Sequence, residues 1–387
     1  MLSSNISFQN FKKKFDKKNV HKKLQTILNI KNAVLDSLSQ NYKDSYSKKK
    51  ISKLYKYQNF IIVGMGGSIL GIKSIFNFLK SKIKKNFIFM DNFQSNIQYI
   101  DKKKNYLKII ISKSGNTLET IANSNILIKK DKKNIFITEN KDSYLMNLAK
   151  KFKADIIHHN NYIGGRYSVL SEVGMLPAQL MGLNPKKFRK FNQVIKNKNF
   201  IDNLVLNVLN IFYLSKKKKS NSIILNYDEN SSDLFYWYQQ LVAESLGKKN
   251  NGIFPIISNM PKDNHSLMQL YLDGKKNNFY TFFFVDDVKS NKINNTEVLD
   301  AFKHLKNKSF KKILKSQCLA TQNIFKRKNI PFRSFLIKKR SEETLGELFT
   351  FFILETILLG KLMKLNPYNQ PAVELIKTET TKIIKKS

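Results

Sequence analysis

The fold of this chain is decided by the stretch ISKSGNT, which occupies Ile111–Thr117. An apolar run at residues 107–111 precedes it and predicts a buried strand, and a helical pattern at residues 118–128 follows it. A strand that passes into a helix through Ser, Thr and Gly places hydroxyls and free backbone N–H groups at the helix N-terminus, and this arrangement binds a phosphate dianion. The stretch therefore predicts an anion site at a strand end of an α/β fold.

A second turn of the same kind, GMGGS at Gly64–Ser68, lies one strand–helix unit earlier. It is not the dinucleotide fingerprint, because Ile69 stands where a third glycine is needed, and no Walker lysine follows it. Taken alone, it equally fits a plain tight turn. Together, four hydroxyl side chains of the two turns can point to one place, which predicts one anionic group held between them. These side chains are Ser68, Ser112, Ser114 and Thr117.

Short apolar runs alternate with helical patterns along most of the chain. Strands are predicted at residues 60–63, 87–90, 107–111, 134–137, 155–157, 222–225, 279–285 and 331–337, with a strand or loop at 254–257. Further helices are predicted near residues 96–99, 310–327 and 342–363. Short apolar strands separated by helices are typical of parallel sheets covered on both faces, whose ligands lie at the carboxyl ends of the strands.

Three segments are expected from this pattern. Residues 1–50 are polar and helical in pattern, without glycine or an obvious strand, and predict an N-terminal helical arm. Residues 51–195 predict a first α/β domain that carries the phosphate-binding loops, and residues 196–387 predict a second one with a C-terminal helix. A chain of 387 residues is long enough to give each domain its own core.

The net charge of +41 comes almost wholly from lysine, since only five of the 69 basic residues are arginine. Proteins that bind nucleic acids favour arginine, which makes bidentate contacts to guanine and phosphate. The lysines are spread along the whole chain and cluster between periodic segments. We therefore expect a solvated basic surface and no nucleic-acid partner, although a positive field would speed the capture of a phosphorylated metabolite.

Other classes of protein are disfavoured by the sequence. No stretch approaches eighteen uncharged apolar residues, so no membrane span or membrane partner is expected. The N-terminus lacks the apolar core of a secretory signal, so a cytoplasmic location is expected. The single cysteine, Cys318, excludes an intrachain disulfide and disfavours a cysteine-based metal site. No metal-ligand cluster is visible, so neither a metal nor a cofactor is expected.

Two further motifs carry charged groups suited to catalysis. In GGRYS, at Gly164–Ser168, two glycines let the chain deliver Arg166 to a crowded site. In a predicted helix that ends at Gly247, Gln240 and Glu244 lie on one face at i and i+4, and a carboxylate there can act as a general base. Taken alone, Arg166 also fits a surface turn and Glu244 a solvated helix position.

Two more candidates are His265, at the start of a predicted helix, and Lys377, which follows a mostly apolar helical turn. Taken alone, Lys377 also fits a surface position. The remaining four histidines are interpreted as structural or surface residues.

Six motifs, in this order, resemble the phosphoglucose isomerase family, and the match covers most of the chain, from about residue 60 to residue 377. The matching segments are residues 64–71, 112–120, 164–168, 244–248, 265–270 and 366–377. The resemblance implies two sugar-isomerase (SIS) domains, each a parallel five-stranded sheet flanked by helices, with the site between them. It also implies a homodimer without a cofactor. The implied reaction is aldose–ketose interconversion of D-glucose 6-phosphate and D-fructose 6-phosphate through a cis-enediol, in glycolysis and gluconeogenesis.

The resemblance also implies a role for each candidate residue. Glu244 would move the proton between C2 and C1, and Arg166 would stabilise the charge of the enediolate. His265, contributed by the neighbouring subunit, would assist opening of the sugar ring together with Lys377. The implied substrate-binding residues are Gly67, Ser68, Ser112, Lys113, Ser114 and Thr117 for the phosphate, and Gln240 and Gln370 for the sugar.

The chain departs from the family pattern at three places. The sequence of Ser114–Thr117 replaces the Thr-Phe-Thr-Thr of many members, Leu246 stands where many have Asn, and Ala372 where many have Gly. These changes leave the catalytic residue types intact, but a looser site could also accept mannose 6-phosphate. The alternatives are therefore a dual phosphoglucose/phosphomannose isomerase, a non-catalytic SIS-type sugar-phosphate sensor, and a nucleic-acid binder driven by charge.

Overall fold

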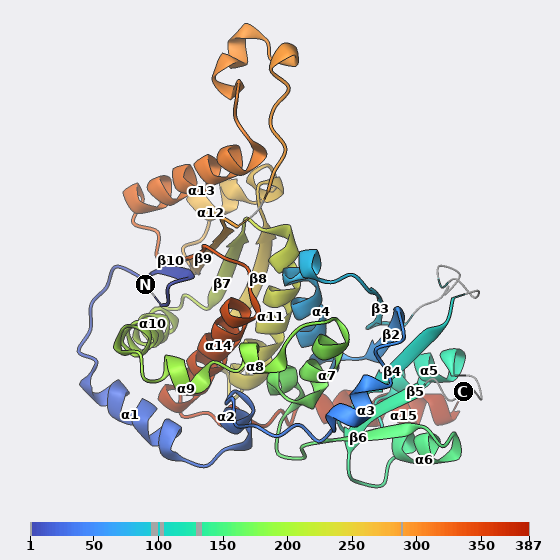
Figure 1. The fold of residues 1–387 in the computed structure, drawn as a ribbon. Coiled ribbons are helices and arrows are strands. Elements are labelled where there is room, and N and C mark those ends of the chain that lie inside the picture. Colours follow the sequence, from blue (N-terminus) through green and yellow to red (C-terminus); the bar gives the residue numbers. More distant parts are fainter. Residues whose placement is uncertain (1, 94–99, 101–103, 129–133, 288, 387) are drawn as a thin grey trace.

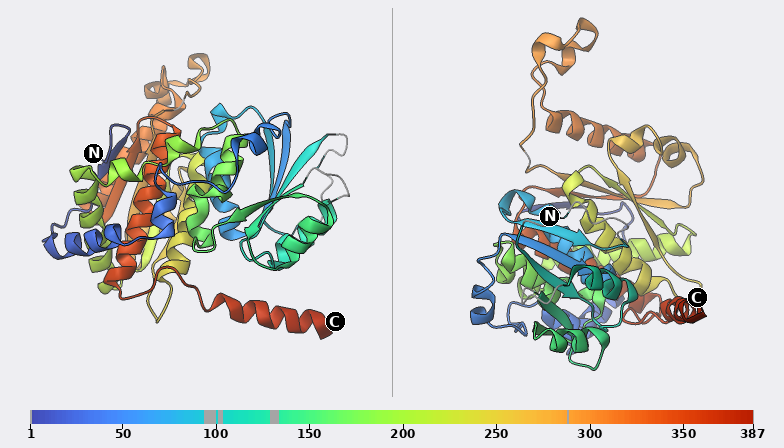
Figure 2. Two further views of the ribbon diagram at one scale, coloured as in Figure 1. Left: turned by 60° about the horizontal axis from the view of Figure 1, so that its bottom comes forward. Right: turned by 90° about the vertical axis from the view of Figure 1, so that its right-hand side faces the viewer.

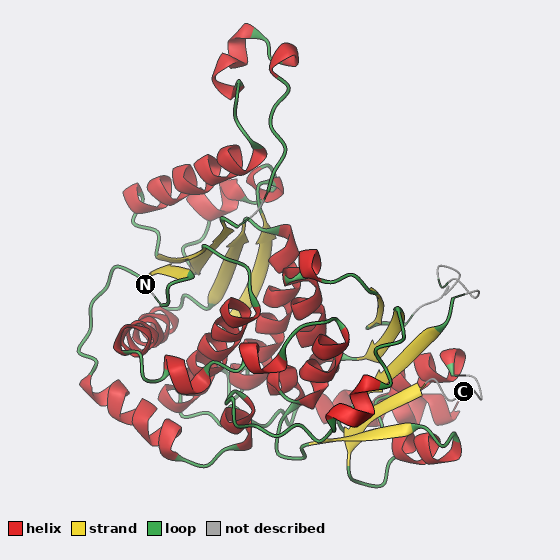
Figure 3. Cartoon of the chain, in the orientation of Figure 1, coloured by secondary structure: helices red, strands yellow, loops and turns green. Residues whose placement is uncertain are grey.

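The computed structural model describes residues 2–93, 100, 104–128, 134–287 and 289–386, and the helix expected near residues 96–99 lies outside them. The described chain forms two five-stranded sheets, each with helices on both faces (Figure 1 and Figure 3). This arrangement confirms the predicted α/β class.

The first sheet is parallel throughout, in the order β3-β2-β4-β5-β6. Its strands are β2 (Asn59–Gly64), β3 (Asn86–Met90), β4 (Tyr106–Ile111), β5 (Asn134–Glu139) and β6 (Asp155–His159). Gly64, the last residue of β2, is paired with Ile111, the last residue of β4. Since the two glycine- and serine-containing turns follow these residues directly, they lie side by side at the carboxyl edge of the sheet.

The second sheet has the order β1-β10-β9-β7-β8. Its strands are β1 (Ile6–Gln9), β7 (Asn221–Asn226), β8 (Phe254–Asn259), β9 (Asn278–Val285) and β10 (Phe332–Ile337). Four of them are parallel, whereas β1 pairs antiparallel with β10. The segment that was predicted as a strand or a loop at residues 254–257 is therefore a strand.

The strand β1 corrects the expectation that the first fifty residues contain no strand. Ile6 and Phe8 are buried and Gln9 is exposed, so the segment has the alternation of an edge strand. Four residues are too few for that alternation to stand out in the sequence. The start of the N-terminal arm consequently belongs to the second sheet, and its helix α1 (Lys18–Asn29) packs against α10 (Lys198–Lys216) and α14 (Glu342–Leu362).

The helices lie in layers on the two sheets. One continuous core joins one face of each sheet to the helices α4 (Leu70–Phe78), α7 (Glu172–Leu180), α10, α11 (Ser232–Leu246) and α14. The outer face of the first sheet packs on α5 (Leu118–Leu127) and α6 (Tyr144–Lys151), and that of the second on α12 (Met268–Asp273) and α13 (Phe310–Arg327). The remaining helices are α2 (Ala33–Ser37), α3 (Lys48–Ser52), α8 (Pro185–Phe188), α9 (Phe191–Val194) and α15 (Val373–Lys386).

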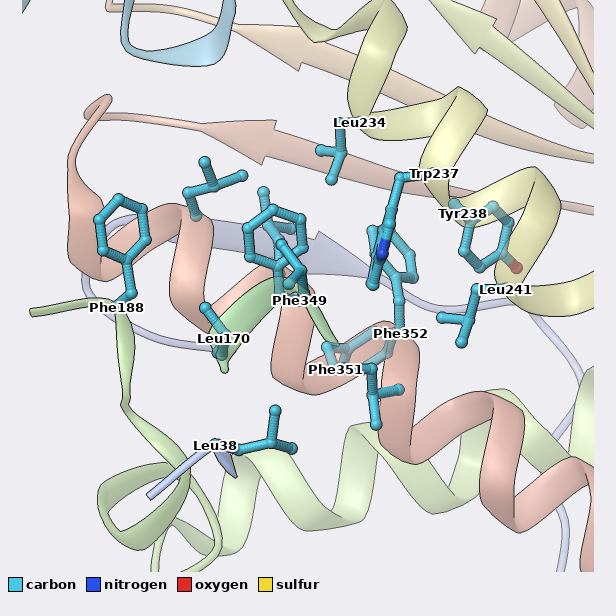
Figure 4. Packing of buried hydrophobic residues seen from close by; sticks show 14 of the residues in the cluster. Leu38, Leu170, Phe188, Leu234, Trp237, Tyr238, Leu241, Phe349, Phe351 and Phe352 are labelled. Atoms are coloured by element: carbon cyan, nitrogen blue, oxygen red, sulfur yellow. The ribbon is translucent and has the colours of Figure 1, made fainter. Parts of the chain in front are cut away.

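The shared core places α11 next to α4, so a helix of the second half lies against the first half. Aromatic side chains fill the space between α11 and α14 (Figure 4). The ring of Trp237 lies edge-on to that of Phe349, with 4.7 Å between centroids, and Tyr238 lies 4.6 Å from Phe352. Because α11 is anchored on both sides, its last turn has a fixed position relative to the first sheet.

Two parts of the chain extend from this body. The helix α15 extends away from both sheets, and residues 289–309, which precede α13, form a projecting arm (Figure 2). The domain boundary expected near residue 195 falls between α9 and α10, and two separately folding domains stay a prediction because the core is continuous. Within the described residues, none of the helices combines the length and apolar composition that a membrane crossing needs.

Candidate active site

The carboxyl edge of the first sheet carries a hydroxyl-lined turn. Ser112 is buried directly after β4, and its Oγ lies 2.8 Å from Oγ1 of Thr117. Thr117 precedes α5 without capping it through its side chain. The first amides of α5 are therefore left for another acceptor, which is how helix N-termini bind phosphate.

A glycine with a left-handed backbone shapes this turn. Gly115 has a φ of +68°, and a Cβ atom there would lie 2.2 Å from Oγ of Ser143, the residue that caps α6. A side chain at this position would therefore meet both backbone strain and a clash. The turn stays compact, with its hydroxyls held at the end of β4.

Two residues of this turn that were predicted to bind phosphate interact with other groups of the protein. The Nζ of Lys113 lies 3.2 Å from Oε1 of Glu139, at the end of the neighbouring strand β5. Ser114 is exposed, and its hydroxyl accepts a hydrogen bond from the backbone N–H of Asn116. The structure thus brings Ser112 and Thr117 together, while Lys113 is engaged in an ion pair.

The second element of the site is an arginine–carboxylate pair. Arg166 belongs to the short helix η3 (Gly165–Leu170) and is 1% exposed, and its Nη1 lies 3.2 Å from Oε2 of Glu244. Glu244 lies in the last turn of α11, and its side chain is 30% exposed. A nearly buried guanidinium therefore faces a carboxylate that solvent and small molecules can reach.

Several groups hold the Arg166 side chain in place. Its Nε donates to Oγ of Ser245 at 2.8 Å, its Nη1 to Oε1 of Gln370 at 2.7 Å, and its Nη2 to the carbonyl of Pro367 at 2.6 Å. The Tyr167 hydroxyl also donates to the carbonyl of Pro367. The planar fork of arginine suits such a set of fixed acceptors.

The role of Ser245 and of the Pro367 carbonyl was not anticipated from the sequence. Both lie within motifs that were recognised, at residues 244–248 and 366–377, but no local pattern shows which atoms meet. Lys248 of the first motif is a further example, because its Nζ donates to the carbonyls of Asn366 and Asn369. The two motifs therefore form one hydrogen-bonded unit around Arg166.

The first turn of the first sheet touches this unit directly. A Cβ atom on Gly67 would lie 2.1 Å from the carbonyl carbon of Gly165, so only glycine permits this approach of two backbones. A Cβ atom on Gly66 would lie 2.7 Å from Nε2 of Gln240, and that amide donates to Oε1 of Glu244 at 2.8 Å. The turn that follows β2 thus joins the phosphate edge to the carboxylate.

Gln240 retains one free acceptor. Its Oε1 atom is buried and has no hydrogen-bond partner among the described residues. A buried polar atom without a partner is costly, and its presence beside Glu244 fits a group that binds a ligand hydroxyl. Ser68 lies against the end of β2, since its Cβ is 3.2 Å from where a Cβ of Gly64 would be.

Burial and neighbouring charges shift two groups around Arg166. Burial raises the pKa of the Tyr167 hydroxyl, against the opposing effect of the Arg166 charge, so Tyr167 stays a neutral donor. Burial, together with the nearby Arg166 charge, lowers the pKa of Lys248, and the Glu244 charge opposes this. Both effects result from the low dielectric around the guanidinium.

The structure places His265 away from Glu244 in the same chain. His265 is exposed and follows the short helix η5 (Lys262–Asn264), close to the carboxyl end of β8, where Asp263 accepts from the Asn259 amide. The start of α11 is at that end too, since Oγ of Ser232 donates to the Asn259 side chain. Glu244 lies twelve residues further along α11, which corresponds to roughly 18 Å along the helix axis.

Lys377 is likewise outside the group assembled around Arg166. It lies in the first half of α15 with a side chain that is 61% exposed, and its Nζ is paired with Oε1 of Glu374 at 2.6 Å. Gln370, three residues before α15, does reach Arg166. The C-terminal motif is therefore only partly assembled within one chain.

The assembled groups can bind an anion and act on a nearby proton. Ser112, Thr117 and the start of α5 suit a phosphate, whereas Glu244 can accept a proton and Arg166 can stabilise a developing negative charge. Among the described residues, no group of three or more His, Cys, Asp or Glu side chains is placed to hold a metal ion. The fold and the site together define an α/β protein that acts on a small phosphorylated compound.

Comparison with known proteins gives the family. The model of the family described as phosphoglucose isomerase matches residues 12–257. The glucose-6-phosphate isomerase of Methanocaldococcus jannaschii is 32% identical over 359 residues, which cover 87% of this chain and 86% of that protein. The glucose-6-phosphate isomerase of Mycoplasmopsis pulmonis is 33% identical, with 89% of this chain and 88% of that protein covered. The chain therefore belongs to the phosphoglucose isomerase family.

A solved structure with a similar fold agrees with this result. A hypothetical protein from Thermus thermophilus has a TM-score of 0.83 and 22% sequence identity, and covers 95% of this chain and 94% of its own. At this identity the likeness concerns the fold alone. It extends over both sheets, so the pairing of the two halves is a property of that fold.

Proposed function

We propose that this chain interconverts D-glucose 6-phosphate and D-fructose 6-phosphate, a proposal supported by relatives that are named glucose-6-phosphate isomerase. The observation that carries the proposal is the distance of 3.2 Å between Nη1 of Arg166 and Oε2 of Glu244. This pair lies next to the turn that follows β2. A base beside a fixed cation is what proton transfer α to a carbonyl needs.

In the proposed reaction, Glu244 takes the proton from C2 of the open-chain aldose and returns it to C1. The electron pair of the broken C–H bond forms the C1–C2 double bond of the cis-enediolate, and the carbonyl oxygen on C1 gains negative charge. The proton of the C2 hydroxyl then passes to that oxygen, so that protonation at C1 leaves the carbonyl group at C2. Arg166 stabilises that charge. Because five hydrogen bonds hold Arg166, it does not have to reorganise when the charge develops.

The other residues bind and position the substrate. Ser112 and Thr117, with the start of α5 and the Gly67–Ser68 turn, bind the phosphate; Ser114 lies at the rim. Lys113 joins them by exchanging its Glu139 partner for the phosphate. The free Oε1 of Gln240 accepts a hydrogen bond from a sugar hydroxyl. Gln370 helps to position the sugar indirectly, because it accepts a hydrogen bond from Arg166.

The proposal includes a homodimer in the cytoplasm, taking part in glycolysis and gluconeogenesis. His265 of this chain lies at the far end of α11 from Glu244, so the ring-opening histidine of each site comes from the partner subunit. The exposed helix α15 packs at the same interface, and this brings Lys377 to the sugar ring. The site is therefore complete only when two copies associate.

A coupled assay tests the proposal. Purified protein is given glucose 6-phosphate, and fructose 6-phosphate is measured. We expect turnover of glucose 6-phosphate with a kcat of about 1–10³ per second. If the protein binds glucose 6-phosphate without converting it, a SIS-type sensor is supported instead. Mannose 6-phosphate in the same assay separates a dual isomerase, because a specific enzyme leaves it unchanged. A gel shift at physiological salt checks the nucleic-acid alternative.

A further inference from the structure

A buried histidine lies just before the loop that delivers Arg166. His159 is the last residue of β6 and is 2% exposed, in contrast to its exposed neighbour His158. Its Nδ1 lies 3.0 Å from Oε1 of Glu172, and its Nε2 lies 3.0 Å from the carbonyl oxygen of Ile163. Both ring nitrogens therefore face oxygen atoms, and these can only accept when the Glu172 carboxyl is ionised.

This geometry determines the protonation state that satisfies the ring. A neutral imidazole has one N–H donor and one acceptor nitrogen, so it can make only one of these two bonds. Only the imidazolium form donates to both Glu172 and Ile163. In the neutral form one of the two buried contacts would lack its hydrogen bond, and burial of an unpaired nitrogen or carbonyl is costly.

Glu172 connects three segments of the chain. Its Oε1 also accepts from the Asn160 backbone N–H at 2.7 Å, and its Oε2 accepts from the Tyr42 hydroxyl at 2.8 Å. Although burial of Glu172 opposes ionisation and is the largest single influence, the contacts with His159 and the backbone N–H groups that Glu172 accepts from together lower the pKa of the carboxyl. Glu172 thus holds the N-terminal arm, the end of β6 and the loop at residues 160–165 together.

Other titratable groups surround this pair. From the N-terminal arm these are Tyr42, Asp44 and Tyr46, and from the segment after α8 it is Arg189, which binds Asp44 through two nitrogens at 2.6 and 3.0 Å. Burial raises the pKa of Tyr42 and of Tyr46, so both hydroxyls are neutral. The Arg189–Asp44 pair is matched in charge, and the basic side chain that contacts Glu172 directly is His159.

The loop that this pair holds ends at the site. After Ile163 the chain passes through Gly164 and Gly165, whose backbone touches Gly67, to Arg166. The carbonyl oxygen of Arg166 accepts from Nε1 of Trp237 at 3.2 Å. A shift of the loop would therefore displace both the guanidinium and the turn after β2.

We propose that His159, as an imidazolium paired with Glu172, is a positioning residue that fixes the loop at residues 160–165 and thereby the place of Arg166 beside Glu244. The proposal rests on the proposed function, because it assigns His159 an effect on that reaction. His159 itself touches neither Glu244 nor the phosphate turn.

The test compares His159→Gln with the matched control His158→Gln, on the exposed neighbour. We expect His159→Gln to lower kcat about tenfold to hundredfold, because a displaced catalytic group costs this much, with KM changed less than about threefold. His158→Gln leaves both constants unchanged. In an Arg166→Lys background, His159→Gln should cause little further loss, since the group that it positions is already impaired. Independent, multiplicative losses would overturn the proposal.

A second readout does not need activity. Trp237 is the single tryptophan of the chain, so its fluorescence reports on the hydrogen bond to the Arg166 carbonyl. A shift of the emission maximum is expected in His159→Gln and not in His158→Gln. If the wild-type protein lacks isomerase activity, the proposed function fails, whereas the fluorescence still tests the positioning.

Thermal unfolding shows whether His159→Gln is folded. Should it fail to fold, Tyr42→Phe replaces it, because this variant removes only one donor from Glu172 at a half-buried position. We then expect a fall in kcat of about twofold to fivefold at unchanged KM, together with an emission shift. Wild-type values of kcat and emission in Tyr42→Phe would overturn the proposal.

Discussion

The two sheets contribute to the site from opposite ends. The first sheet supplies its carboxyl edge, where Ser68 and Ser112 follow β2 and β4. The second sheet supplies Glu244, in the last turn of α11, beside the amino end of β8, where Gln239 of the same helix donates to the Pro255 carbonyl. Its own carboxyl edge, which carries His265, faces away from Glu244.

The two sheets therefore contribute residues to the site from different edges, although their architecture is similar. Ligands of open parallel sheets usually lie beyond the carboxyl ends of the strands, and the first sheet follows this rule. The second sheet departs from it because α11 runs back against its strands and packs on α4, which brings the C-terminal end of α11 to the first sheet. In the proposed function, one sheet binds the phosphate and the other supports the base.

Removal of the base should have the largest effect. We expect Glu244→Gln to lower kcat about 10²- to 10⁴-fold while binding survives, because the amide keeps the shape and cannot accept the proton. Coupled assays measure kcat, and calorimetry with 6-phosphogluconate measures binding. Glu229→Gln, an exposed residue at the opposite end of the second sheet, is the control. Near-normal turnover of Glu244→Gln would reject the role of the base.

The buried ion pair inside the second half should affect stability rather than catalysis. Arg333 and Glu355 are fully buried and directly bonded, so Arg333→Leu leaves an unpaired carboxylate and lowers the free energy of unfolding by about 3–5 kcal/mol. Urea unfolding measures this. The double variant with Glu355→Leu should recover part of the loss. A stable Arg333→Leu protein with impaired kcat would show that the second half does more than support the base.

Arg166 should behave differently from Arg333, because it is equally buried but faces the solvent-accessible Glu244. We expect Arg166→Lys to lower kcat about 10²- to 10³-fold, with a smaller rise in KM, since a single ammonium replaces the planar fork. Steady-state kinetics measures both constants. Arg327→Lys, on the exposed surface of α13, is the control. A rise in KM alone would assign Arg166 to substrate binding.

The smallest of these effects is expected at the carboxyl edges themselves. Ser112→Ala should raise KM about tenfold to hundredfold, because a hydrogen bond to a charged group is lost, and should leave kcat nearly unchanged. Ser258→Ala, at the carboxyl end of β8, removes a bond to Asp263 and should leave KM as it is. Equal KM values for wild type and Ser112→Ala would show that the carboxyl edge of the first sheet does not bind the phosphate and, in this respect, does not differ from that of the second sheet.

Much of the fold could be predicted because its signals are local. The helix predicted at residues 310–327 and the strand at 279–285 agree with α13 and β9 within one residue. The strand β1 was missed because its four residues are paired with β10, about 330 residues later in the chain. Hydrophobic periodicity describes neighbours in sequence and carries no information about such a partner.

The candidate site was predicted in the same uneven way. The motifs around Ser112, Arg166 and Glu244 were recognisable. The structure joins Arg166 directly to Glu244, and the turn after β2, which lies beside the end of β4, touches the segments that carry both. The acceptors that hold Arg166 were not recognisable, because the carbonyl of Pro367 has no side-chain signature and lies 201 residues away. His159 was interpreted as a structural or surface residue, since the two oxygen atoms that its ring contacts become evident only from the structure.

The sequence by itself determined the α/β class, the succession of strands and helices, and the two polar turns that follow β2 and β4, because these depend on periodicity and on residue type over a few positions. Only the tertiary structure decided that Glu244 comes from the amino end of the second sheet, that His265 lies at the other end, and that Arg166 is held by atoms from distant segments. Long-range packing of α11 on α4 and hydrogen bonds to backbone atoms cause these placements, and neither leaves a pattern in the order of residues.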